Sequence, residues 1–295
     1  MHVFLTGATG YVGSAVAAAL QRDGHTVTGL AHTDKSARTL EQRGIRVLRG
    51  DLYDGASLAR GVRAADGTIH AANTGGLDMP LAEQAAVSAM LGALEGTHKA
   101  FLYTQGIWDY GDTGPALATE ESPFQPAAFF TWRPVLAQRI LAARERGICS
   151  IVISPALVYG HGGGIPAMLV QSARQNGAAR YIGTGENHWT LVHVDDLADL
   201  YVRALMEALG GSTFIAASNP PLRVRELAAA ASRGAGAGGK TEAWPLTAAR
   251  RALGPWVDAL VFDQQMSGEK ARRVLGWAPQ APLALDDLEC GSYAS

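Results

Sequence analysis

The chain has 295 residues, in which 25 Lys and Arg stand against 27 Asp and Glu, for a formal net charge of −2 at pH 7. This length is enough for one large α/β core with a smaller lobe, and neither sign of charge forms a block typical of an interaction tail, so no nucleic-acid or membrane partner is expected. Cys149 and Cys290 stand in no metal-binding or redox spacing, and Met1 leads into an apolar strand rather than a leader peptide. We therefore expect a reduced, cytoplasmic protein.

Short β-rich runs alternate with helical patterns through the first half of the chain, as in a parallel sheet covered on both faces. The predicted strands are His2–Thr6, His25–Ala31, Ile45–Leu48, Gly67–Ala72, Ala100–Thr104, Cys149–Ser154 and Thr213–Ala216. The predicted helices are Tyr11–Arg22, Lys35–Gln42, Leu81–Leu94, Trp132–Glu145 and Val194–Ala208. The pattern predicts an α/β protein with a doubly wound parallel-sheet Rossmann fold, whose ligand crevice lies outside the carboxyl ends of the strands.

Glycine- and proline-rich connections interrupt the strand pattern beyond Ser154. Because Val194–Ala208 and the strand at Thr213–Ala216 suit the main sheet, we expect the lobe to be built from two segments. The prediction is a dinucleotide-binding domain at 1–155, to which 191–217 returns, and a substrate-binding lobe formed by 156–190 and 218–295.

The most informative motif is a glycine-rich turn between the first strand and the first helix. Gly7 permits the sharp turn, Gly10 has no Cβ to block a pyrophosphate, and Gly13 lets the helix pack close to the sheet. The free N–H groups at the helix start would face the diphosphate, aided by the helix dipole. The alternative is a glycine turn without a ligand. We predict a dinucleotide site that includes Gly7, Thr9, Gly10, Tyr11, Val12 and Gly13.

The end of the second strand predicts which dinucleotide binds. NAD-specific domains carry an Asp or Glu about 20 residues beyond the turn, where it binds the ribose hydroxyls. Here Ala31 stands at that place, and His32 and Lys35 follow as two potential cations that would attract a 2′-phosphate. Asp34 is evidence against this interpretation, and the alternative is a surface loop that does not discriminate. The sequence favours NADP over NAD.

Seven motifs extend this pattern over nearly the whole chain: TGATGYVG at 6–13, GDLYD at 50–54, DGTIHAA at 66–72, LVYG at 157–160, VHVDDLADLY at 192–201, AWPL at 243–246 and LGW-x-P at 275–279. Because of these motifs, the chain resembles members of the extended and atypical short-chain dehydrogenase/reductase superfamily, in the NAD-dependent epimerase/dehydratase branch. The resemblance implies a homodimer formed through Leu81–Leu94 and Trp132–Glu145. It also implies that the cofactor is lined by Asp51, Leu52, Ala71, Ala72, Asn73 and Pro155. Thr104, at the end of the fifth strand, is expected to join them.

The catalytic positions depart from the pattern of that superfamily. Its members usually carry a Ser after the fifth strand and a Tyr-x-x-x-Lys pair, whereas this chain has Gln105, Phe129 and Arg133. Phe129 has no proton to give and an arginine is effectively always charged, so the usual acid/base relay cannot run. We expect Arg133 to act as a fixed positive charge beside the cofactor ribose or the substrate. Gln105 is expected to polarise a substrate carbonyl.

Three other residues are candidates for proton transfer. The sequence around Tyr159 favours an aromatic side chain packed in the core over a catalytic acid. His161 and His188 lie in predicted loops where a substrate pocket would form, although many loop histidines are only solvated. Asp195 is interpreted as a helix N-cap, and its His193-Val194-Asp195-Asp196 segment has no third ligand at metal spacing. No metal site is therefore expected.

Together these features favour an NADP-dependent oxidoreductase or epimerase of the short-chain dehydrogenase/reductase type, with an atypical active site. Its substrate would be a small, partly apolar molecule held between the sheet and the lobe. Two alternatives stay open. One is a non-redox isomerase, cyclase or dehydratase on the same scaffold, and the other is a dinucleotide-sensing regulator without turnover.

Overall fold

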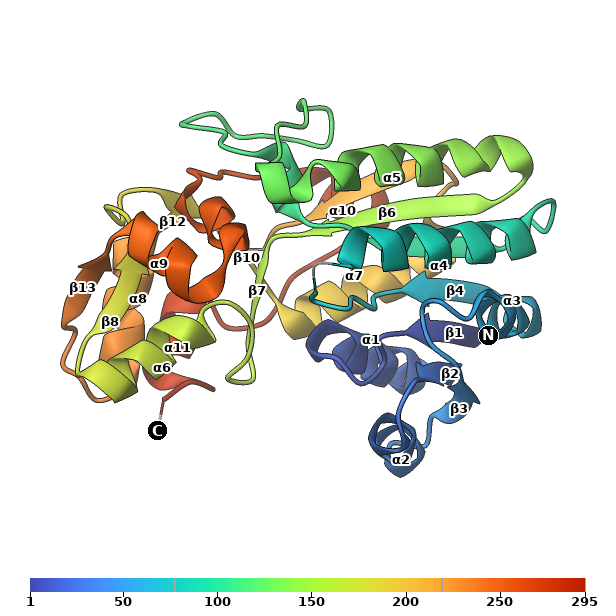
Figure 1. The fold of residues 1–295 in the computed structure, drawn as a ribbon, viewed down its shortest axis with the longest axis horizontal. Helices are drawn as coiled ribbons and strands as arrows, with labels where there is room; N and C mark the ends of the chain where they lie inside the picture. Colours follow the sequence, from blue (N-terminus) through green and yellow to red (C-terminus); the bar gives the residue numbers. More distant parts are fainter. Residues whose placement is uncertain (77, 219, 295) are drawn as a thin grey trace. The chain divides into compact units, whose positions relative to one another are not determined.

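The computed structural model describes residues 1–76, 78–218 and 220–294 (Figure 1). These form two compact units. Unit 1 comprises Met1–Gln105, Trp132–Ile153 and Leu197–Phe214, and unit 2 comprises Gly106–Thr131, Ser154–Asp196 and Ile215–Ser295. Among the helices of the described residues, none combines the length and the apolarity that a bilayer crossing requires.

A seven-stranded sheet, most of which belongs to unit 1, confirms the predicted α/β class. Its order is β11-β6-β5-β4-β1-β2-β3, and the pairings β1 with β2 and β4, β2 with β3, and β5 with β4 and β6 are parallel. The order reverses at β1, so the carboxyl end of β1 marks the crevice expected of a doubly wound sheet. The strands are β1 His2–Thr6, β2 Thr26–Ala31, β3 Arg46–Arg49, β4 Gly67–His70, β5 Ala100–Thr104, β6 Cys149–Pro155 and β11 Ser212–Ala216.

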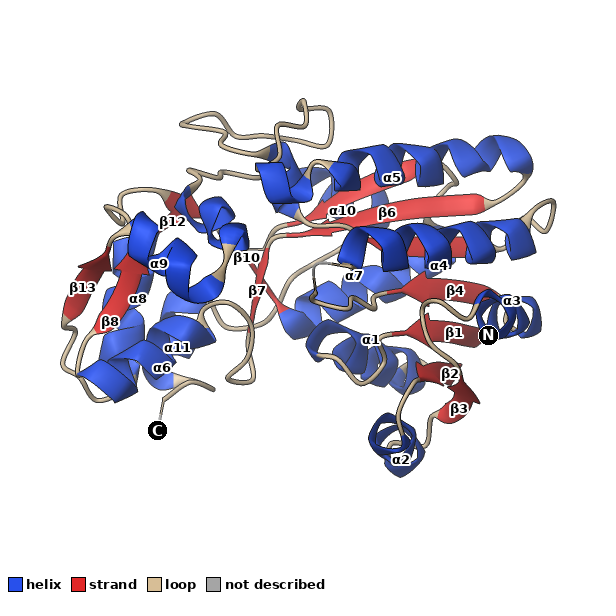
Figure 2. Ribbon diagram, in the orientation of Figure 1, coloured by secondary structure: helices blue, strands red, loops and turns tan. Residues whose placement is uncertain are grey.

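Helices alternate with these strands, as Figure 2 shows. Apolar side chains of α3, α4 and α5 pack with Phe4, Phe101 and Val152 of the sheet in one core cluster. The helix α3 was not predicted; its N-cap Asp54 accepts a hydrogen bond from the Ser57 N–H at 3.0 Å. The helices connected to this sheet are α1 Tyr11–Arg22, α2 Asp34–Gln42, α3 Gly55–Ala64, α4 Met79–Leu94, α5 Trp132–Ala142 and α7 Val194–Glu207.

Unit 2 combines helices with short strand pairs, β10 with β7, β12 with β9 and β13 with β8. Its core contains Tyr159, Trp189, Leu191 and Leu227. The strands are β7 Leu157–Tyr159, β8 Ala179–Ile182, β9 His188–Trp189, β10 Leu191–His193, β12 Leu222–Arg223 and β13 Thr241–Trp244. The helices are α6 Ala167–Asn176, α8 Val224–Gly234, α9 Leu246–Leu253, α10 Glu269–Leu275 and α11 Ala284–Cys290, with 3₁₀ turns η1 Ile107–Tyr110, η2 Ala128–Phe130 and η4 Pro255–Val261.

Unit 2 contains the segments 156–190 and 218–295 that were expected to form the lobe, together with 154–155, 191–196 and 215–217, which were expected in the dinucleotide-binding domain. It also takes in Gly106–Thr131 from that predicted domain. Hydrogen bonds account for this addition. The Thr113 N–H donates to the Asp263 carbonyl at 2.9 Å, the Ala118 N–H donates to the Gln265 carbonyl at 2.8 Å, and the buried Gln264 amide donates to the carbonyls of the η1 turn. Such long-range backbone pairing is not visible in local sequence patterns.

Candidate functional site

The glycine turn after β1 has the backbone geometry that its spacing predicted. Gly7 adopts a left-handed φ of +77°, and a Cβ there would lie 2.5 Å from the Ala71 carbonyl oxygen. A Cβ on Gly13 would collide with the Gly7 carbonyl. Gly10 is the N-cap of α1, and its N–H donates to the Gly7 carbonyl at 2.8 Å. These close contacts fix the start of α1 against the carboxyl ends of β1 and β4.

Unit 1 has a cavity of about 580 Å³ at this turn. Its walls come from the residues that follow β1, β2, β3 and β4, which is where a doubly wound sheet binds its ligands. Sequence reasoning missed Leu30, Tyr53 and Thr74, of which Tyr53 belongs to the GDLYD motif. The lining residues are Gly7, Thr9, Gly10, Leu30, His32, Asp51, Leu52, Tyr53, Ala71, Ala72, Asn73 and Thr74.

Other residues expected at the cofactor do not line this cavity. Tyr11, Val12 and Gly13 form the first turn of α1, and Lys35 lies in α2. The Thr104 hydroxyl is hydrogen-bonded to the Tyr201 hydroxyl at 2.6 Å, and burial raises the pKa of that tyrosine above its ordinary value. Pro155 is the last residue of β6.

The corner at the end of β2 holds several charged groups. His32 lines the cavity, and Thr33 caps α2 by accepting a hydrogen bond from the Ser36 N–H. Asp34, the first residue of α2, pairs with the Arg49 guanidinium at the end of β3, at 2.7 Å. Sequence reasoning missed Arg49, whose guanidinium brings a further positive charge to this corner.

The replaced catalytic positions fall just after β5, in the 3₁₀ turn η2 and in the first turn of the helix α5. Gln105 is 5% exposed, and its N–H donates to the Ile153 carbonyl at 2.8 Å. Arg133 lies in the first turn of α5, with its guanidinium carbon 5.4 Å from the centre of the Trp132 ring. Phe129 lies in η2 and meets Phe130 edge-on, with ring centroids 5.0 Å apart.

The tyrosines near the strand ends are held in packed positions. Tyr159 is buried, and its hydroxyl donates to the Pro282 carbonyl at 2.5 Å. Burial also raises the pKa of Tyr110, which lies in η1, above its ordinary value. Neither side chain is placed to serve as a base.

His188, in β9, is fixed by a carboxylate from a distant segment. Its Nδ1 atom lies 2.8 Å from Asp263 Oδ1, and its backbone N–H donates to the same oxygen at 2.8 Å. The two side chains are 25% and 30% exposed. A carboxylate that holds one imidazole nitrogen fixes the ring orientation and leaves the other nitrogen to exchange a proton. Nothing in the local sequence around Asp263 pointed to this pairing.

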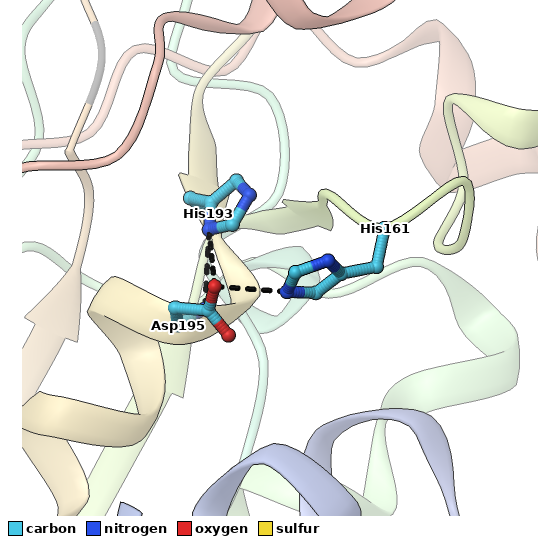
Figure 3. A group of neighbouring side chains, drawn as sticks. All are labelled: His161, His193 and Asp195. Carbon is cyan, nitrogen blue, oxygen red and sulfur yellow. Dashed lines mark hydrogen bonds and ion pairs between the residues drawn. The ribbon is translucent and has the colours of Figure 1, made fainter. Parts of the chain in front are cut away.

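The His161 side chain lies beside Asp195 at the start of α7, as Figure 3 shows. Its Nε2 atom lies 2.8 Å from Asp195 Oδ2. The prediction that Asp195 caps α7 was wrong, because α7 begins at Val194 and Asp195 lies in its first turn. The His193 side chain instead accepts the Asp195 N–H at Nδ1, at 3.2 Å, and so performs the capping.

A second cavity, of about 320 Å³, lies within unit 2. Its walls are partly aromatic, with Tyr181, Trp189 and Trp244, and partly aliphatic, with Leu169 and Leu260 among them. Polar groups of Arg180, Gln171 and Gln175 complete the lining. Such a mixture is typical of pockets for small, partly apolar molecules.

A family model and several known proteins match this chain. Residues 3–216 match the NAD dependent epimerase/dehydratase family. The chain is 30% identical to the uncharacterized protein YLL056C of Saccharomyces cerevisiae over 98% of both chains, and 28% identical to the UDP-glucose 4-epimerase of Mycolicibacterium smegmatis over 96% of this chain and 95% of that one. It is 26% identical to the 2-alkyl-3-oxoalkanoate reductase of Stenotrophomonas maltophilia over 77% of this chain and 73% of that one.

Among solved structures, the dTDP-glucose 4,6-dehydratase DesIV of Streptomyces venezuelae, determined with NAD bound, superposes with a TM-score of 0.83. The superposition covers 99% of this chain and 96% of that one, at 20% sequence identity. This likeness shows that the two chains share a fold that includes both the sheet and the segments of unit 2.

Proposed function

The chain belongs to the NAD dependent epimerase/dehydratase family, and on that premise we propose that it is an NADP-dependent oxidoreductase or epimerase that works without a Tyr-Lys relay. Its substrate is a small, partly apolar molecule. The observation that carries the proposal is the cavity of unit 1, which is lined by the glycine turn and by the ends of neighbouring parallel strands.

The residues of this cavity fit a dinucleotide. Gly10 has an extended backbone at the start of α1 and lines the cavity, so its missing side chain leaves room where a pyrophosphate would approach the helix N-terminus. Asp51, Leu52 and Ala71 to Asn73 would hold the rest of the cofactor. When bound, the nicotinamide ring supplies the hydride donor or acceptor that no protein side chain can provide.

We expect NADPH to bind more tightly than NADH by about 1–2 kcal/mol, roughly tenfold, because a 2′-phosphate would gain charge-assisted bonds from His32, Lys35 and Arg49. The Arg49 guanidinium already engages Asp34 at 2.7 Å, which offsets the charge of that carboxylate. Fluorescence titration of both cofactors measures the preference. Asp34→Asn should increase it, and His32→Ala should reduce it. Equal affinities, or a preference for NADH, would show that Asp34 governs the corner.

Proton transfer is assigned to the pair of His188 and Asp263. Asp263 holds the Nδ1 atom at 2.8 Å and orients the ring, and the Nε2 atom exchanges the proton with the substrate. His161 is the second candidate, but its side chain is 62% exposed, which gives a less fixed position. Gln105 polarises the reacting carbonyl, and Arg133 supplies a permanent positive charge.

The substrate class is inferred from the cavity of unit 2, which is lined not by His188 itself but by Trp189, its neighbour in β9. Its aromatic and aliphatic walls suit an alkyl group or a flat ring, and its polar groups suit an oxygen-bearing end. The similarity to a 2-alkyl-3-oxoalkanoate reductase supports an oxo compound with an apolar substituent. Phe129 and Arg133, in place of Tyr and Lys, keep a non-redox isomerase, cyclase or dehydratase as the second candidate function.

A further inference from the structure

We propose that His161, His193 and Asp195 form a binding site for a divalent transition-metal ion, best matched by Zn²⁺. The site lies in unit 2 and uses neither the residues proposed to hold the dinucleotide nor the His188 and Asp263 pair. It does use His161, the second candidate for proton transfer. The expectation of no metal rested on the lack of a third ligand at local spacing. His161 supplies that ligand from 34 residues before Asp195.

The ligand atoms are already close to the spacing that zinc requires. One ligand atom from each residue lies within 4.8 Å of the other two. Asp195 Oδ2 is 2.8 Å from His161 Nε2 and 3.7 Å from His193 Nδ1. Ligand atoms about 2.0–2.2 Å from a tetrahedral zinc ion lie about 3.4 Å from one another. The two measured distances fall on either side of that value, so small side-chain shifts would complete the triangle.

The two imidazole rings also have a suitable arrangement. Their centroids are 5.5 Å apart, and the ring planes meet at 68°. Two imidazoles on one tetrahedral zinc ion have ring centres about 5 Å apart, from the same bond length and angle. Figure 3 shows both rings turned toward the Asp195 carboxylate, with His161 reaching in from its loop.

The surrounding chain fixes one ring firmly and leaves the other accessible. His193 is buried, meets Tyr159 edge-on at 5.1 Å, and lies against Gly160, where any Cβ would collide with the imidazole. His161 follows directly with a left-handed φ of +50°, which residues other than glycine rarely adopt. The His161 and Asp195 side chains are 62% and 53% exposed, so a fourth position is open to water.

The donor set selects the class of ion. Two imidazoles and one carboxylate suit Zn²⁺, Co²⁺ or Ni²⁺, whereas Mg²⁺ and Ca²⁺ prefer oxygen ligands throughout. Two features weaken binding. The Nδ1 atom of His193 would exchange its hydrogen bond with the Asp195 N–H for the metal, and the N-terminus of α7 is the positive end of a helix dipole. We therefore expect weaker binding than at a closed structural zinc site.

The test is titration of the chelator-treated, full-length protein with Zn²⁺ in competition with a chromophoric chelator. The expected result is one ion per chain, with an affinity that falls at least tenfold in both His161→Ala and Asp195→Asn. Thermal unfolding should shift upward with Zn²⁺ in the wild type and not in these variants. His193 is left unchanged because its ring is part of the packed core.

His98→Ala is the matched control, since His98 is also exposed and also has a left-handed backbone, with φ of +57°. It should bind Zn²⁺ like the wild type. Gly10→Val should also keep the zinc site, which separates this proposal from the dinucleotide proposal. Absence of binding to the wild type, or wild-type affinity in either His161→Ala or Asp195→Asn, would overturn the metal site.

Discussion

Replacing Gly10 with valine is expected to abolish dinucleotide binding and to leave unfolding cooperative. The backbone of Gly10, with φ of −76° and ψ of 173°, is one that valine adopts without strain. An added Cβ would lie 3.2 Å from the Gly7 carbonyl oxygen, so the turn has to shift by only a few tenths of an ångström and the fold should be kept. The added side chain would stand in the cavity that the glycine turn lines, where the pyrophosphate would pass. Fluorescence titration with NADPH measures the loss, and thermal unfolding measures the integrity of the fold.

Gly92→Val is the matched control for this change. Gly92 lies in α4, and a Cβ there would meet no atom within 4 Å. This variant should bind NADPH like the wild type. If Gly10→Val also retained binding, the N-terminal glycines would be only a packing device and the dinucleotide would have to bind elsewhere.

Replacing His188 with alanine is expected to lower turnover by roughly 10²–10⁴, the usual contribution of a general acid or base. NADPH affinity should stay unchanged, because His188 does not line the cavity of unit 1. Steady-state kinetics of the variant separate the two effects. Asp263→Asn keeps an acceptor for the His188 N–H but removes the charge that orients the ring, so its loss should be smaller and should change the pH profile of kcat.

His98→Ala is the control for these variants, because His98 is an exposed histidine of unit 1. It should keep full turnover. A full rate in His188→Ala together with a large loss in His161→Ala would transfer the acid/base role to His161. Full rates in both variants would mean that the proton comes from water or from the substrate itself. The non-redox and sensor alternatives would then gain support.

Features that depend on local backbone geometry could be predicted from the sequence. Gly7 and Gly13 stand where a Cβ would collide with backbone, so their spacing predicted the glycine turn. The alternation of apolar runs with helical patterns predicted the parallel sheet. The helix α3 was not predicted, because its segment begins with Gly55 and has few apolar residues. Its start depended on a side-chain cap from Asp54.

Pairings between distant side chains could not be predicted. His188 meets Asp263 from 75 residues away, and His161 meets Asp195 across 34 residues, so no local spacing reveals either pair. The same limit applies to Arg49, whose pairing with Asp34 changes the charge at the cofactor corner. Tertiary contacts of this kind depend on how loops return to the sheet, which a single sequence pattern does not specify.

The most direct measurement follows the hydride. NADPH carrying deuterium at the transferable position of the nicotinamide C4 atom would be incubated with the protein and a 2-alkyl-3-oxo acid. The account predicts loss of the reduced-nicotinamide absorbance, matched by an equal amount of hydroxy acid carrying the deuterium, and neither change in Gly10→Val. Stoichiometric binding of NADPH with constant absorbance, while the oxo acid is converted to an unlabelled product, would contradict it.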